Sequence, residues 1–334
     1  MRFLSEKGVR RYLAKKSGAE SGAFHYNQDL TGTRKRLAIL PKDLEYVSIF
    51  LPLLLELSRS TPKESFHILC EQSYQPLLKS IGLEAAGLYF DPSKNRYGDP
   101  NFQLLENKLR ALAPEVCLML EPKPDLLQLY LARASSATWR IGLASEEHYP
   151  FLNISFHPEG ASAYSFRRNL QSIFGLSDAA QDHPFAHNPE QLSSRHVILL
   201  NLEPSVSGKP WTSEEISEVA NHLDPHFRLL SLAPDPKHLE PYAPMLERLS
   251  IRSAPMASSY TAFLDLLRQY HGMISLNSAH AQLAINVSHI PTLLIAEPAT
   301  PQWLPPSSPE LFIFERGKPL RKEDLLPLTS GKNH

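Results

Sequence analysis

Short apolar runs alternate with longer amphipathic segments along the chain from Arg36 onward. The apolar runs predict buried strands, and the segments between them have the spacing of apolar residues that is typical of helices. Strands that alternate with helices indicate a parallel sheet with helices on both faces. In the first half the predicted strands are 37–40, 66–70, 87–90, 116–120, 138–142 and 151–155, and the predicted helices are 44–58, 74–81, 101–112, 125–133 and 167–174.

A polar stretch that contains Pro and Gly, residues 175–194, separates this half from a second alternating set. We interpret it as a linker between an N-terminal domain, 31–174, and a C-terminal domain, 195–334, with residues 1–30 as an appendage. Two similar α/β halves predict a cleft between them, where ligands usually bind. The predicted strands of the second half are 196–202, 227–232, 249–252, 273–276, 292–295 and 311–315, and its predicted helices are 212–223, 258–269, 279–287 and 322–326.

The segment 273–298 is the most informative part of this pattern. It predicts a buried strand, a turn at Asn277 and Ser278, a helix from Ala279 and a second strand. Asn and Ser are good N-cap residues, so we expect the helix start to present free backbone N–H groups just beyond a strand end. Phosphates and nucleotides bind at this place in α/β sheets.

Composition excludes several classes of protein. The chain has 334 residues and a formal net charge of −1, so it has no basic field for nucleic acid. Its longest apolar run, 47–55, is far shorter than the ~20 residues of a spanning helix. Cys70 and Cys117 lie in apolar runs, so we expect buried, reduced thiols and a cytoplasmic protein. The sequence has no glycine-rich phosphate loop, no Asp-x-Asp and no zinc pattern, and we expect no metal.

The first sixteen residues form a basic amphipathic segment if they are helical. Such a helix can lie on an anionic membrane surface and hold the protein at the inner membrane. It can also pack on the body of the protein with its basic face in solvent. The sequence leaves both interpretations open.

Four stretches, in order, resemble the glycosyltransferases of family 9, the bacterial lipopolysaccharide heptosyltransferases. They are 37–54, the Trp-Arg-Ile-Gly at 139–142, the strand and Lys-x-Trp motif at 197–211, and the segment 273–298. The resemblance implies the GT-B fold, in which two Rossmann-like domains with parallel sheets face each other across a cleft. It also implies a nucleotide-activated donor such as an ADP-sugar, no other cofactor, and a lipopolysaccharide or glycolipid acceptor.

The family's catalytic base is an Asp in a Gly-Asp pair at the start of the first helix. The matching pair here is Glu45-Tyr46. Tyrosine has a reference pKa of ~10, so Tyr46 is a poor base at neutral pH. Asp43 and Glu45 lie within one helical turn of it and are the candidates to replace the base. They are also ordinary first-turn carboxylates, which the helix dipole favours.

The Lys-x-Trp motif is present as Lys209-Pro210-Trp211. In the family this lysine contacts the donor phosphate, and a lysine supplies a mobile charge suited to that role. Ser205 and Ser207 can offer hydroxyl groups to the same phosphate. Lys209 can equally be an exposed loop lysine, and we expect Trp211 to be a packing anchor rather than a stacking platform.

The family's donor loop has the pattern Asp-Thr-Gly-x-x-His, and the polar residues of this chain differ from it. The matching positions hold Asn277, Ser278, Ala279 and Gln282. Ala279 adds a methyl group where glycine lets a diphosphate approach the backbone. Gln282 keeps a donor without positive charge. His280 is two positions, roughly 200°, away from the family's histidine on a helix, so we expect a surface or boundary residue.

Two functions follow from these observations. The first is a divergent family 9-type glycosyltransferase that transfers a sugar from a nucleotide-activated donor to a lipopolysaccharide or other glycolipid acceptor. The second is a homologue with the same fold and no transfer activity, which acts as a binding or scaffold protein and has a protein partner. The spacing of the matching motifs, Lys209 and the two-domain organisation favour the first, and the replaced residues favour the second.

Overall fold

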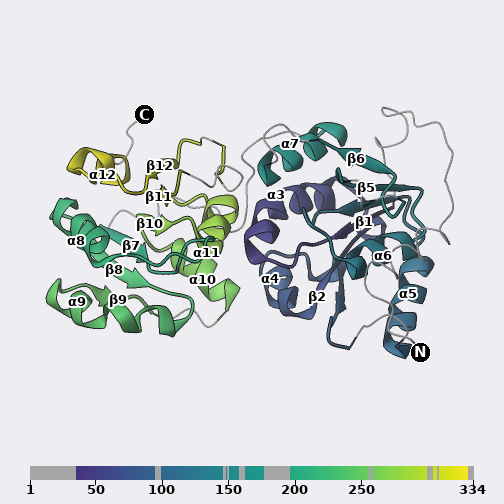
Figure 1. Ribbon diagram of the computed structural model, residues 1–334, viewed down its shortest axis with the longest axis horizontal. Helices are drawn as coiled ribbons and strands as arrows, with labels where there is room; N and C mark the ends of the chain where they lie inside the picture. Colours follow the sequence, from purple (N-terminus) through teal and green to yellow (C-terminus); the bar gives the residue numbers. More distant parts are fainter. Residues whose placement is uncertain are drawn as a thin grey trace. The chain divides into compact units, whose positions relative to one another are not determined.

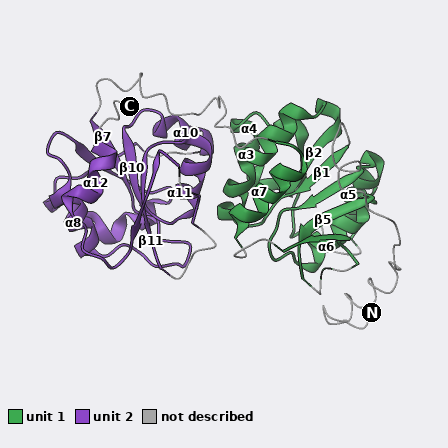
Figure 2. Cartoon of the chain, turned by 90° about the horizontal axis from the view of Figure 1, so that it is seen from above, with its two compact units in different colours: residues 1–179 green, residues 180–334 purple. Residues whose placement is uncertain are grey.

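The chain divides into two compact units, residues 1–179 (unit 1) and 180–334 (unit 2), which Figure 2 shows in different colours. The predicted appendage, 1–30, lies outside the described residues, as does the predicted linker, 175–194, apart from its first two residues. The computed structural model describes residues 35–94, 99–145, 148, 150–157, 162–176, 196–255, 259–298, 304–306 and 308–329.

Unit 1 is built on six strands and the helices that connect them. The strands are β1 (Arg36–Ile39), β2 (Phe66–Glu71), β3 (Gly87–Phe90), β4 (Val116–Met119), β5 (Trp139–Leu143) and β6 (Ile154–Phe156). The helices are α3 (Leu44–Ser60), α4 (Gln75–Ser80), α5 (Pro100–Leu112), α6 (Leu126–Ala134) and α7 (Ala163–Ile173).

The sheet of unit 1 is parallel and has the strand order β3-β2-β1-β4-β5-β6. Helices α3, α4 and α7 cover one face, and α5 and α6 cover the other (Figure 1). All residues of β1 and β4 are buried because both faces of these central strands are covered. The sheet grows in opposite directions from β1 and β4, so the loops after these two strands leave the sheet side by side.

Two elements of unit 1 differ from the prediction. Strand β6 covers 154–156 rather than 151–155, because Phe151 and Leu152 are packed into the core from the turn before it. Helix α7 begins four residues earlier than predicted. Ser162 caps it by accepting a hydrogen bond from the N–H of Tyr164.

Unit 2 repeats the architecture with a second set of elements. The strands are β7 (Val197–Asn201), β8 (Arg228–Leu232), β9 (Arg252–Ser253), β10 (Gly272–Leu276), β11 (Thr292–Ala296) and β12 (Leu311–Glu315). The helices are α8 (Ser213–His222), α9 (Ala243–Arg248), α10 (Tyr260–Leu267), α11 (Ala279–Leu283), which continues as the π-helix η9 (Ala284–Ser288), and α12 (Lys322–Thr329).

The sheet of unit 2 is also parallel and has the order β12-β11-β10-β7-β8-β9. Helices α8, α9 and α12 lie on one face, and α10 and α11 lie on the other (Figure 1). The proline-rich segment 234–244 forms two short 3₁₀ turns and the start of α9, which the sequence pattern did not predict. The predicted class, α/β with two parallel sheets, is confirmed.

The two loops that leave the middle of the second sheet carry most of the predicted site. In this sheet the direction of growth changes between β7 and β10, so the loops after Asn201 and Leu276 are neighbours. The N–H of Val206 donates to the carbonyl oxygen of Asn277 at 2.7 Å and joins them. Among the residues that the structure describes, no helix is long and apolar enough to span a membrane.

Candidate functional site

The loop that carries Lys209 is a tight turn between β7 and α8. The N–H of Ser205 donates to the carbonyl oxygen of Lys209 at 2.9 Å, and the N–H of Gly208 donates to that of Ser205 at 2.7 Å. Gly208 has a φ of +80°, a conformation that glycine adopts without strain. The backbone therefore holds Ser205, Ser207 and Lys209 at the carboxyl edge of the sheet.

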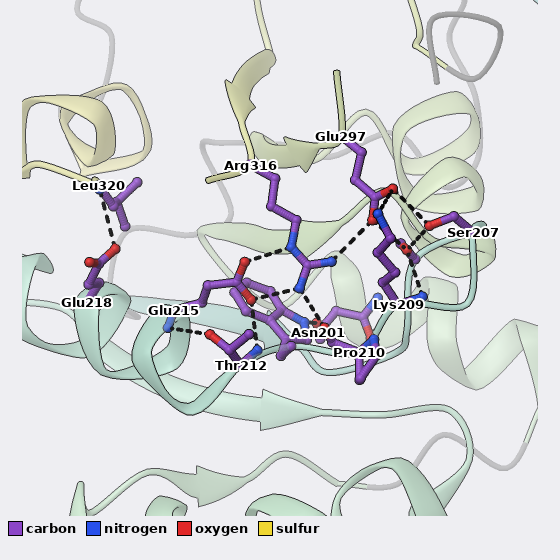
Figure 3. Close-up of polar contacts among 12 residues, drawn as sticks. Asn201, Ser207, Lys209, Pro210, Thr212, Glu215, Glu218, Glu297, Arg316 and Leu320 are labelled. Carbon is purple, nitrogen blue, oxygen red and sulfur yellow. Dashed lines mark hydrogen bonds and ion pairs between the residues drawn. The ribbon is translucent and has the colours of Figure 1, made fainter. Parts of the chain in front are cut away.

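Glu297, at the end of β11, gathers the polar groups of this turn (Figure 3). Its carboxylate accepts hydrogen bonds from Lys209 Nζ at 3.1 Å, Ser207 Oγ at 3.0 Å and Ser205 Oγ at 3.4 Å. Burial opposes ionisation of Glu297, but the hydrogen bonds from Lys209 and Ser207 outweigh it and lower its pKa. The lysine that the resemblance assigns to a phosphate is thus paired with a carboxylate of the chain.

Arg316 is a second cation beside the Glu297 carboxylate, and it also binds Glu215 in the first turn of α8 (Figure 3). Its Nη1 lies 3.3 Å from Glu297 Oε1, and its Nε and Nη2 donate to the two carboxylate oxygens of Glu215 at 2.6 and 2.9 Å. Glu215 also completes a capping box with Thr212. Sequence reasoning missed Arg316 because it is 101 residues from Glu215 in the chain.

Trp211 is a packing anchor, as predicted. Its side chain is 3% exposed and belongs to the core cluster of unit 2. Its Nε1 donates to the carbonyl oxygen of Asn201 at 2.8 Å, and the hydroxyl of Tyr242 donates to the Trp211 carbonyl oxygen at 3.0 Å. The ring is therefore not available as a platform for a ligand.

The start of α11 is capped, but its N–H groups are not free as the sequence predicted. Ser278 is the N-cap, and its Oγ accepts a hydrogen bond from the N–H of Ala281 at 3.2 Å. The same oxygen accepts from Nδ2 of the fully buried Asn201 at 3.1 Å. The N–H of His280 donates to Glu203 Oε2 at 3.0 Å. Two of the N–H groups that the site would offer to a phosphate are thus used internally.

Glu203 and His280 form a close pair that sequence reasoning did not find. Glu203 Oε1 lies 3.0 Å from His280 Nδ1, and the two side chains are only 15% and 16% exposed. Burial opposes ionisation of Glu203, but the hydrogen bonds and charge of His280, together with the hydroxyl of Ser278, outweigh it and lower its pKa. His280 lies at the boundary of the core, as predicted. Its ring also stacks on Tyr260.

A chain of buried amides lies behind this turn. Gln282 Nε2 donates to Asn277 Oδ1 at 2.6 Å, and Asn286 Nδ2 donates to the Gln282 carbonyl oxygen at 2.8 Å. Ala279 is the first residue of α11. Asn277 Nδ2 is buried and has no hydrogen-bond partner among the described residues, which costs about 1–3 kcal/mol. The side-chain amide of Gln282 is thus used to hold Asn277 in the turn before α11.

The candidate base region of unit 1 lies at the start of α3. Burial, together with the charges of Glu121, Asp43 and Glu45, raises the pKa of Tyr46 to about 12. Asp43 is the N-cap residue of α3, but its side chain makes no capping hydrogen bond. It is exposed, and Glu45 is half-buried in the first turn. The structure therefore brings both candidate carboxylates near Tyr46 and leaves Tyr46 protonated at neutral pH.

A carboxylate that sequence reasoning missed lies beside this helix start. Glu121 follows β4, and its side chain accepts hydrogen bonds from the N–H groups of Lys42 at 3.0 Å and Lys123 at 3.1 Å. Lys42 Nζ in turn pairs with Asp125, the N-cap of α6. The loops after β1 and β4 meet at this point, so the fold brings these groups together although they are about eighty residues apart.

Comparison with known proteins separates the fold from the function. No protein-family model matches the chain, and no curated protein matches it. Solved structures do match. A family 9 glycosyl transferase from Veillonella parvula has a TM-score of 0.65 at 15% identity, over 87% of this chain and 88% of its own. The E. coli heptosyltransferase WaaC, with ADP-2-deoxy-2-fluoro heptose, has a TM-score of 0.61 at 14% identity, over 87% and 95%.

A third structure, E. coli ADP-heptose LPS heptosyltransferase II, has a TM-score of 0.65 at 14% identity, over 88% of this chain and 97% of its own. This chain has the fold of the family 9 glycosyltransferases. The GT-B-like fold that the sequence resemblance implied is confirmed. At 14–15% identity the likeness concerns the fold, so what the chain does has to be argued from the residues at the ends of its strands.

Proposed function

We propose that the chain is a non-catalytic relative of the family 9 glycosyltransferases that acts as a binding or scaffold protein. One observation carries the proposal. The carboxylate of Glu203 accepts the N–H of His280 at 3.0 Å in the first turn of α11. By the resemblance, that turn is where a donor diphosphate would bind. The Glu203 carboxylate therefore accepts a hydrogen bond that, by the resemblance, a donor phosphate would accept.

The charges support this reading. A phosphate on the same turn would bring its charge within about 4 Å of Glu203, which costs about 4 kcal/mol at an effective dielectric constant of 20. That cost corresponds to roughly a thousandfold in affinity. Lys209 offsets little of it because Glu297 already holds its ammonium group. We therefore expect the native chain to exclude diphosphates.

The catalytic groups support the same reading. With a pKa of about 12, Tyr46 does not take a proton from an acceptor hydroxyl at neutral pH. Loss of a general base alone lowers a rate by about 10²–10⁴. Asp43 and Glu45 remain the candidates for that role if the chain is active.

Sugar transfer is the second candidate function, and two observations favour it. The side chain of Lys209 is 65% exposed, and Glu297 would keep Arg316 as its partner if Lys209 turned toward a phosphate. Asn277 Nδ2 is a buried donor that a ligand oxygen would satisfy. In this case Lys209, Ser205, Ser207 and the loop at 277–282 would bind the nucleotide-sugar, and a lipopolysaccharide or other glycolipid would be the acceptor.

Calorimetric titration of the purified chain with ADP-, UDP- and GDP-sugars separates the two functions. We expect no binding at millimolar ligand, because Glu203 and Glu297 satisfy the phosphate-facing groups. Saturable binding that Lys209→Ala abolishes would contradict the exclusion of diphosphates, on which the non-catalytic proposal rests, and would favour transfer. Lys237→Ala, which changes an exposed lysine in a 3₁₀ turn of unit 2, is the control and should leave the result unchanged.

For either function we propose a cytoplasmic protein, with residues 1–16 as the contact with the inner membrane. Co-sedimentation with anionic liposomes tests this contact. If a chain that lacks residues 1–16 pellets with the liposomes as much as the full chain does, the proposed membrane contact is wrong.

A further inference from the structure

A pocket of about 320 Å³ lies in unit 1, and none of the residues of the Lys209 loop or of α11 line it. It is formed where β3 ends and α5 begins, and we call it the β3–α5 pocket. Among the strands that the structure describes, β3 is the edge strand of this sheet, and none of them pairs with its outer side. The volume is at the lower end of the range for small-molecule sites, about 300–1,000 Å³.

One part of the wall of the β3–α5 pocket is apolar. Leu88 and Phe90 of β3 and Leu105 of α5 line it and also belong to, or pack on, the core of unit 1. Leu104 lies on its rim and is 60% exposed, which is unusual for a leucine in a helix that packs on a sheet. A ligand with an apolar body would cover Leu104 and gain about 25 cal/mol for each Å² of apolar surface removed from water.

Two of the three charged residues that line the pocket are cations. Lys94 and Lys108 line it together with one carboxylate, Asp91. Lys94 Nζ lies 3.2 Å from Asp91 Oδ2 and is 73% exposed, so this pair is a weak surface ion pair. The pocket therefore carries one positive charge in excess. Gln72, Tyr89 and Asn101 add uncharged polar groups.

We propose that the β3–α5 pocket binds a small organic anion with an apolar body, of the size of a medium-chain carboxylate. The apolar body lies against Leu88, Leu104 and Leu105, and the anionic group lies between Lys94 and Lys108. The volume is too small for a folded peptide segment. The site does not depend on the function proposed above, because it lies in unit 1 and uses none of the residues of the donor loop.

Titration of the full chain with anilinonaphthalenesulfonate, an aromatic anion that fluoresces on apolar surfaces, tests the site. We expect a saturable rise in fluorescence for the native chain. The double variant Lys94→Gln, Lys108→Gln should bind about tenfold more weakly because two surface charges are lost. Lys63→Gln with Lys79→Gln removes two exposed lysines elsewhere in unit 1 and should bind like the native chain.

Competition gives a second readout that does not depend on a variant. Octanoate should displace the dye, and octylammonium, which has the same apolar body and the opposite charge, should not. Leu104→Asp should weaken the binding of both anions and leave the thermal unfolding of the chain unchanged, because Leu104 is exposed. Absence of saturable binding, equal weakening in the two lysine double variants, or displacement by octylammonium would each overturn the proposal.

Discussion

Replacement of Trp211 with alanine is expected to lower the free energy of unfolding of unit 2 by about 3–5 kcal/mol. The substitution removes a side chain that is 3% exposed from the core cluster of this unit. It also removes the Nε1 donor from the carbonyl oxygen of Asn201, at the end of the strand that leads to the Lys209 loop. Urea unfolding followed by circular dichroism measures the change.

A conservative variant divides the effect of Trp211 into its parts. Trp211→Phe keeps most of the packing and loses the hydrogen bond, so it should cost only about 1–2 kcal/mol. Hydrogen exchange should show faster exchange in residues 197–329 and unchanged exchange in unit 1. An unfolding curve of Trp211→Ala that matches the native one would show that this residue is not an anchor.

Replacement of Arg140 with methionine should have an effect of similar size on unit 1. The Arg140 side chain is 2% exposed, and its guanidinium donates to the carbonyl oxygens of Phe151 at 2.6 Å and Ala137 at 2.7 Å. These bonds hold the turn before β6. Methionine fills a similar volume and leaves both buried carbonyl groups without this donor, which costs about 3 kcal/mol or more in total.

Arg110→Met is the matched control for Arg140. Arg110 is exposed on α5 and pairs with Glu106 one helical turn away, so its loss should change stability by about 0.5 kcal/mol or less. Hydrogen exchange in Arg140→Met should rise around residues 137–156. If Arg140→Met and Arg110→Met unfold at the same urea concentration, the guanidinium does not support the turn.

Arg140 and Trp211 show that the motifs resembling the family have structural roles in this chain. Both belong to motifs that match the family, and both are buried with backbone carbonyl groups as their partners. The replaced positions, among them Tyr46 and Gln282, are those that the family's chemistry would use. The retained motifs therefore report the fold, and the changed ones bear on the function.

Local signals in the sequence predicted many elements of the fold. The helices over 126–134 and 213–222 lie within a few residues of the predicted ranges, and in the structure Asp125 and Thr212 form capping boxes at their starts. The central strands were predicted because each is a short run of apolar residues. Strand β6 was misplaced because Phe151 and Leu152 are as apolar as the residues of a strand but pack into the core from a turn.

The polar contacts of the site could not be predicted in the same way. Glu203 and His280 are 77 residues apart, and Lys209 and Glu297 are 88 residues apart. Their meeting depends on the order in which the strands assemble, and the apolar pattern of a single sequence does not contain that order. The sequence shows which polar residues differ from the family pattern, and the structure shows that Glu297 pairs with Lys209 and that Glu203 accepts the N–H of His280.

The pKa of the Glu203 carboxyl group, measured by carbon-13 NMR on the full chain, tests this central claim most directly. The spectrum of Glu203→Gln assigns the signal. We predict a pKa below the ordinary value of 4.5, because the hydrogen bonds and charge of His280 outweigh burial, and we predict the same titration with millimolar ADP present. A pKa at or above 4.5, or a Glu203 signal that moves saturably as ADP is added, would contradict the account.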